Sequence, residues 1–270
     1  MRVMRNISVV VSLLLPCSAY AQEKPILDQV RDIVTSSEGT VRKWIYAPKL
    51  VVVYDRASYE DEITALVDEL NTKVTGFLGI REVEYYDVNG FNNNYYGRTF
   101  FRTFVEDHDG TERTVGRLVF HSNTHTVVRE GDIFLFLTDL KTGILFSEVV
   151  GTDNAAFERL SFAENISKTT CYMNMMSIYN ELQIAWIFIN RDDEVELLKH
   201  CIYEELTQTL GLLRDTEWSS VFTYNDRSGP IVDTSADFHL LNALYGKEIR
   251  PGDSPEKVVD EFKLIIENKE

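Results

Sequence analysis

Residues 200–215 read HCIYEELTQTLGLLRD, and this stretch with the apolar run before it decides the fold. The preceding segment, 182–189 (LQIAWIFI), is almost continuously apolar, which predicts a central β-strand. A helix is expected to follow and to run to Leu210, with Gly211 at its C-terminal end. The residues expected to line its buried face are Val195, Leu198, Ile202, Leu206 and Leu210.

Strand and helix patterns continue on both sides of this stretch. Residues 50–54 predict a buried strand, and a helix of about 20 residues is expected from Ser58 or Tyr59 to near Gly79. Residues 155–180 are expected to be partly helical. The other predicted strands are 82–88, 98–105, 116–121 and 132–137, with Asp109-Gly110 as a hairpin turn, and the other predicted helices are 237–245 and 255–268. This mixture predicts an α/β (α+β) domain.

The chain is acidic, and its start resembles a secretory signal peptide. Its formal net charge is −16, which argues against nucleic acid and anionic membranes as partners. Arg2 and Arg5 precede an apolar run over 7–15, which is too short to span a bilayer, and Ala19-Tyr20-Ala21 fits a cleavage site. We therefore expect residues 1–21 to be removed, no later transmembrane span, and a periplasmic or secreted protein.

The three cysteines bear on processing and on redox state. Leu14-Leu15-Pro16-Cys17 resembles a lipoprotein box in which the proline fits poorly, so an outer-membrane lipoprotein anchored at Cys17 is the alternative to cleavage after Ala21. Cleavage leaves Cys171 and Cys201. An even count in an oxidising compartment favours a disulfide between them, with two buried free thiols as the alternative.

The predicted helix carries polar residues at the spacing of a metal site. Glu204 and Gln208 are four apart, hence one turn apart on the same helix face. With Glu205, Gly211 and Arg214 they fill the frame H-E-x-x-H-x-x-G-x-x-H of a metzincin zinc-peptidase helix. In that frame the histidines bind Zn²⁺ and the glutamate takes a proton from metal-bound water.

None of the three ligand positions of this frame holds histidine. A carboxylate binds zinc, but an amide oxygen is a weak zinc ligand and a guanidinium has only donors. We therefore expect no zinc and no other cofactor, and Glu205 would be a vestigial general base. Asp215 is a weak alternative ligand. We expect Arg214 to replace the metal as the partner of Glu204 and Glu205, and an arginine that points to solvent is the alternative.

At this point the chain resembles an uncharacterised family of exported proteins from Gram-negative bacteria, a domain of unknown function distantly similar to metzincin-type metallopeptidases. The resemblance implies a zincin-like mixed sheet with a central, degenerate active-site helix. The methionine turn that metzincins imply is missing from 219–224. The matching segments are Lys43-Trp44, Leu50–Tyr54, Cys171, Cys201, Glu204–Gln208, Leu210–Leu212, Asp237–Tyr245 and Arg250–Gly252. The expected division is a signal peptide (1–21), an N-terminal helical segment (22–42), a zincin-like domain (43–252) and a C-terminal helix (253–270).

Two further histidine patterns are weaker candidates. His121 and His125 are four apart, but in a strand-to-loop stretch where that spacing does not place both on one face, so they are expected to be polar loop residues. His200 precedes Glu204 by one turn and is able to extend a line through Glu204 and Gln208, although a helix-surface histidine is the simpler interpretation.

Three functions are compatible with these features. The first is a non-catalytic zincin-like domain that binds a protein, a peptide or an envelope component. The second is a hydrolase whose oxygen ligands, Glu204, Gln208 and Asp215, suit Ca²⁺, Mg²⁺ or Mn²⁺. The third is a purely structural envelope protein. Metal content separates the second function from the others.

Overall fold

The computed structural model describes residues 25–88, 101–106, 112–117, 132–139, 170–215, 222 and 234–268. The predicted signal peptide with Cys17 lies outside these residues, as do His121 and His125. None of the described helices is long and apolar enough to cross a membrane.

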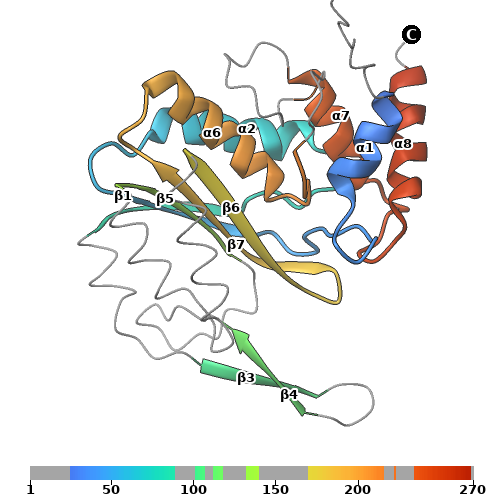
Figure 1. Ribbon diagram of the computed structural model, residues 1–270, viewed down its shortest axis with the longest axis horizontal. Coiled ribbons are helices and arrows are strands. Elements are labelled where there is room, and N and C mark those ends of the chain that lie inside the picture. The colour runs from blue at the N-terminus through green and yellow to red at the C-terminus, as the bar shows by residue number, and fades with distance from the viewer. Residues whose placement is uncertain are drawn as a thin grey trace, which may run out of the picture.

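A five-stranded mixed sheet forms the middle of the described structure, with the strand order β2-β1-β5-β7-β6 (Figure 1). Its strands are β1 (Lys49–Tyr54), β2 (Glu82–Asp87), β5 (Asp132–Thr138), β6 (Cys171–Ile178) and β7 (Glu181–Asn190). The pairs β2–β1, β1–β5 and β5–β7 are parallel, whereas β6 runs antiparallel to β7. The predicted α/β (α+β) class is confirmed, and β2 and β6 are the two edge strands of the described sheet.

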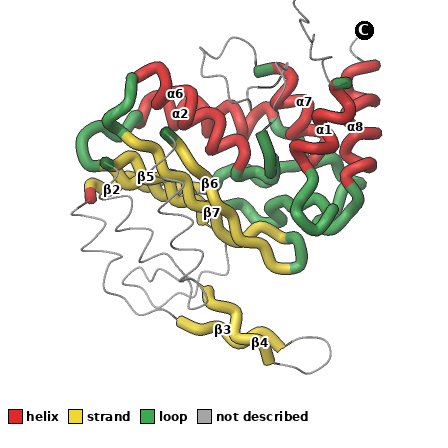
Figure 2. Tube along the Cα trace, in the orientation of Figure 1, coloured by secondary structure: helices red, strands yellow, loops and turns green. Residues whose placement is uncertain are grey.

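All five described helices lie on one side of this sheet (Figures 1 and 2). They are α1 (Ile26–Val34), α2 (Glu60–Lys73), α6 (Val195–Gln208), α7 (Ser235–Leu244) and α8 (Pro255–Glu267). Strand residues alternate between two buried clusters, as the period of a strand requires. On β1, Leu50 and Val52 belong to the large cluster with the helices, whereas Val51 and Val53 belong to a cluster on the opposite face.

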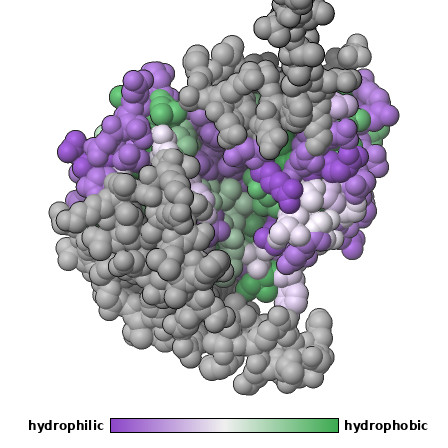
Figure 3. Space-filling view, viewed as in Figure 1, coloured by the Kyte–Doolittle hydropathy of each residue, from purple (hydrophilic) through white to green (hydrophobic). Residues whose placement is uncertain are grey.

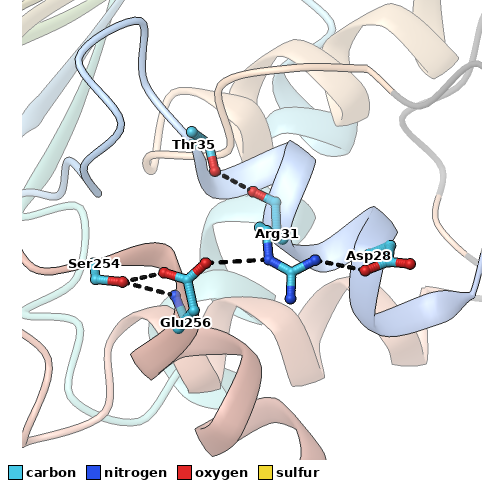
Figure 4. Close-up of polar contacts among 5 residues, drawn as sticks. All are labelled: Asp28, Arg31, Thr35, Ser254 and Glu256. Carbon is cyan, nitrogen blue, oxygen red and sulfur yellow. Dashed lines mark hydrogen bonds and ion pairs between the residues drawn. The ribbon is translucent and has the colours of Figure 1, made fainter.

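The first and last helices pack against each other although they are far apart in sequence. Val30 and Ile33 of α1 share the main core with Val258 and Phe262 of α8. At the surface, Arg31 bridges the two helices through Nε, which lies 3.2 Å from Glu256 Oε1, while its Nη1 pairs with Asp28 (Figure 4). The predicted terminal helical segments therefore contribute to the same core as the sheet.

Several predicted boundaries differ from the structure. The helix from Ser58 or Tyr59 is shorter than predicted, because α2 ends at Lys73 and Gly76 then turns with a φ of +85° where an added Cβ would lie 2.3 Å from Tyr245 O. The prediction of helix within 155–180 is wrong for 171–178, which form β6. The signal that was missed is the Tyr179-Asn180 turn, whose two positive φ angles join β6 to β7 as a hairpin.

The structure differs from the prediction at two more places, in the two-stranded sheet and at the start of α6. β3 (Phe101–Glu106) and β4 (Glu112–Arg117) pair antiparallel around the predicted hairpin turn, so β4 begins before the predicted strand 116–121. Val195, predicted to be buried, is 53% exposed because it is the first residue of α6 and lies beyond the edge of the core.

Candidate functional site

The C-terminal half of α6 is buried on nearly all sides. From His200 to Gln208 only Glu204 is more than marginally exposed. A helix buried all round is a central helix, unlike a surface helix with one apolar face. The predicted central helix is confirmed, and any polar side chain on it has to find a partner within the protein or in a ligand.

Residues far apart in sequence cap the C-terminal end of α6. Trp44 Nε1 donates to the carbonyl oxygen of Thr209 at 2.8 Å, and Tyr245 Oη donates to the carbonyl oxygen of Leu210 at 2.9 Å. Tyr245 Oη also accepts from the backbone N–H of Trp44. Because the last carbonyl groups of a helix have no partner within it, these bonds satisfy acceptors that burial would otherwise leave unpaired.

Lys43 has a similar structural role at the end of α7. Its ammonium donates to the carbonyl oxygens of Leu244 at 3.2 Å and Ile249 at 2.9 Å, and it lies over the ring of Tyr245. Burial lowers the pKa of Lys43. The segments Lys43-Trp44, Leu210–Leu212 and Leu244-Tyr245 thus meet around the end of α6, where they support the helix.

Gly211 allows the chain to turn sharply after α6. Its φ is +110°, and an added Cβ would lie 2.2 Å from the carbonyl oxygen of Arg42. The following backbone is then fixed by a hydrogen bond from Leu213 N to Ile33 O. The prediction that this glycine terminates the helix is confirmed, and both backbone conformation and close packing require it.

A disulfide joins Cys171 to Cys201, with the two Cα atoms 5.9 Å apart. The predicted pairing is confirmed. It links the first residue of the edge strand β6 to the middle of α6. The side chains of α6 near Cys201 are therefore held next to the start of β6.

A polar row runs along α6 at the positions of the degenerate motif. His200 Nε2 lies 3.3 Å from Glu204 Oε2, and one turn further on Gln208 Nε2 donates to Asp215 Oδ1. The suggested line through His200, Glu204 and Gln208 is present, but His200 is 7% exposed, so its interpretation as a surface histidine is wrong. Packing of α6 beneath its neighbours buries it, which helical spacing alone does not reveal.

Glu205 is the most unusual group of the site. Its side chain is 7% exposed, and among the described residues no hydrogen bond or ion pair reaches its carboxyl group. Burial is the main cause that raises its pKa well above the usual value, and the negative charges of Glu204 and Asp215 raise it further. Both causes disfavour the ionised carboxylate as long as no cation lies beside it.

Arg214 does not take the place of a metal. Its side chain is exposed, and no ion pair joins it to Glu204 or Glu205 within the described structure. The expectation that it compensates these carboxylates is wrong, because the turn at Gly211 and the bond between Leu213 and Ile33 direct position 214 to the surface. Asp215, also exposed, contacts Gln208.

The described residues contain no group of three or more His, Cys, Asp and Glu side chains arranged to hold a metal ion. At the three positions of the motif, Glu204 contacts His200, Gln208 contacts Asp215, and Arg214 points outward.

The sequence did not reveal two polar groups, a pair that joins α6 to α7 and a cluster of three residues at the strand ends. Tyr203 Oη donates to the buried Asp237 at 3.2 Å, which joins α6 to α7. Arg191 Nη1 lies 2.6 Å from Asp55 Oδ1 and its Nη2 lies 3.3 Å from Asp139 Oδ2. Asp55, Asp139 and Arg191 each directly follow a strand. Because the ends of parallel strands meet at one edge of a sheet, this position in the sequence is the signal that they lie together. The arginine bridges the two acids, so the group ties the strand ends together.

Comparison with known proteins identifies the family of this chain. The family model described as "Protein of unknown function (DUF2927)" matches residues 105–263, more than half of the chain. The protein belongs to this family. The match covers the disulfide, the whole of α6 and α7, and most of α8, so the polar row lies within the DUF2927 region. No curated protein and no solved structure matches the chain.

Proposed function

We propose that this DUF2927 protein is a non-catalytic, zincin-like binding domain that recognises an extended peptide or protein segment outside the cytoplasm. The observation that carries the proposal is the separate engagement of the three ligand positions. Glu204 contacts His200, Gln208 contacts Asp215, and Arg214 is exposed. The order of a central strand, a buried helix and a glycine turn supports the zincin-like scaffold.

The edge strand supports a peptide as the ligand. β6 has a neighbouring strand on one side only in the described sheet, and most of its residues are half-buried. An edge strand offers backbone donors and acceptors to an added chain, which is a common mode of peptide recognition. On the face that Figure 3 shows, the visible described residues are mostly hydrophilic, with an apolar strip in the region of β6 and β7. Such a strip provides contacts for alternate side chains of a bound segment.

Two measurements test this proposal. The first is elemental analysis of protein purified from the periplasm of a Gram-negative host that carries the full chain. We expect less than a tenth of an equivalent of zinc. One tightly bound zinc per chain, together with a peptidase activity that chelation abolishes, would contradict the proposal and favour the metal-dependent hydrolase.

The second measurement is selection of binding peptides from a random displayed library, followed by hydrogen exchange of the complex. We expect the bound peptide to slow exchange of the amides of β6, because an added strand pairs with its backbone. Protection confined to segments other than β6 would exclude binding along this edge. A failure to enrich any peptide would favour the structural envelope protein.

A further inference from the structure

Glu205 lies buried beside two other acids, which suggests that a positively charged group belongs next to it. The side chain is 93% buried, and no described donor reaches its carboxyl group. A carboxyl group at this depth has lost most of its water without gaining a hydrogen bond from a described donor, which is unfavourable for its charged form. Its neighbours Glu204 and Asp215 add negative charge. This part of α6 therefore favours a cation.

The described donors around Glu205 are directed elsewhere. His200 Nε2 faces Glu204 Oε2, and Gln208 Nε2 donates to Asp215. Arg214 is exposed. Glu205 is the most deeply buried acid of this group, and none of these three side chains pairs with it.

The position of Glu205 connects it with the edge strand. Glu205 follows Cys201 by one helical turn, so both project from neighbouring positions on the same side of α6. Cys201 is bonded to Cys171 at the start of β6. Along β6, Cys171, Met173 and Met175 face the helix layer. A chain that lay beside β6 would alternate in the same way and direct every second side chain towards this layer.

Building on the proposed function, we propose that Glu205, with Glu204 and Asp215 beside it, accepts the guanidinium group of an arginine in a peptide bound along β6. Guanidinium is the cation best suited to this place, because it is weakly hydrated and its planar fork donates to several carboxylate oxygens at once. The acidic net charge of −16 favours approach of a basic segment.

The test uses nuclear magnetic resonance of the full-length processed protein with N-acetyl-arginine methylamide as the probe. The matching citrulline compound, which has the same shape without the charge, is the control ligand. Glu205→Gln removes the charge with little change in size. Glu196→Gln, at an exposed position of the same helix, is the control variant.

We expect the arginine compound to shift signals of α6 and β6 with at least tenfold higher affinity than the citrulline compound. Glu205→Gln should lower that affinity at least tenfold, and Glu196→Gln should leave it unchanged.

Several results would overturn the inference. One is equal binding of the two compounds, and another is an arginine affinity that Glu205→Gln leaves intact. Saturable binding of Ca²⁺, Mg²⁺ or Zn²⁺ that depends on Glu205 and excludes the arginine compound would make this a metal site. No binding of any probe, with a folded spectrum and a more stable Glu205→Gln variant, would show that Glu205 is simply a buried neutral acid. If selected peptides bind along β6 without a basic residue, the inference fails while the proposed function stands.

Discussion

The indole Nε1 of Trp44 donates a 2.8 Å hydrogen bond to the carbonyl oxygen of Thr209, 165 positions later in the chain. A residue that precedes the first strand thereby caps the end of the central helix. Because the helix carrying Glu205 ends here, the position of the site depends on contacts outside the motif itself.

Trp44→Phe should destabilise the protein by about 1–2 kcal/mol. The change keeps an aromatic ring in the core but leaves the buried carbonyl of Thr209 without its donor. Urea unfolding followed by circular dichroism measures the loss. Tyr46→Phe is the control, because Tyr46 is 50% exposed and should tolerate the change. Equal stabilities of the two variants would show that the cap contributes little.

Gly211→Ala should cost about 2–4 kcal/mol. The substituted residue would be strained at a φ of +110°, and its Cβ would overlap the Arg42 carbonyl oxygen at 2.2 Å. Gly39→Ala isolates the backbone effect, since Gly39 has a φ of +77° with nothing within 4 Å of the added Cβ. That control should lose only about 1 kcal/mol in the same unfolding experiment. A similar loss for both would remove the argument from close packing.

Removal of the Cys171–Cys201 disulfide should lower the free energy of unfolding by about 3–4 kcal/mol in the chain-entropy model, given a sequence separation of 30. The double variant Cys171→Ser with Cys201→Ser should unfold at the same urea concentration with and without reductant, whereas the unsubstituted protein should shift on reduction. Alkylation of both thiols in the folded, oxidised protein would contradict the bond.

Arg214→Ala should change stability by less than about 0.5 kcal/mol, as is usual for an exposed residue without a special contact. Thermal unfolding of the variant provides the measurement. A loss of several degrees in the melting temperature would restore the role of Arg214 as partner of the buried carboxylates.

Stability should decrease as the pH rises through the folded-state pKa of Glu205. Folding raises this pKa, so the folded protein binds the proton more tightly than the unfolded chain. The resulting stabilisation is fully present below the unfolded-state pKa and is lost as Glu205 ionises in the folded protein. Urea unfolding across mildly acidic to neutral pH should show this decline in the unsubstituted protein. Glu205→Gln should flatten it, and an unchanged slope would mean that other groups cause it.

The sequence by itself determined the elements that local patterns specify. Continuous apolar residues over 182–189 gave the interior strand β7, and apolar residues such as Leu198, Ile202 and Leu206 gave the buried helix that follows. The glycine at position 211 marked the end of that helix. The cysteine count in an expected oxidising compartment gave the pair Cys171 and Cys201. These predictions succeeded because periodicity, backbone conformation and covalent chemistry act over short stretches or on few residues.

Only the tertiary structure decided the environment of the polar groups. His200 and Glu204 have spacing that fits an exposed row as well as a buried one, and packing of α6 among its neighbours determined that His200 is buried. The turn at Gly211 sent Arg214 outward and left Glu205 without the partner that the motif suggested. Burial and ion pairing depend on which distant segments meet, and helical spacing carries no information about those segments.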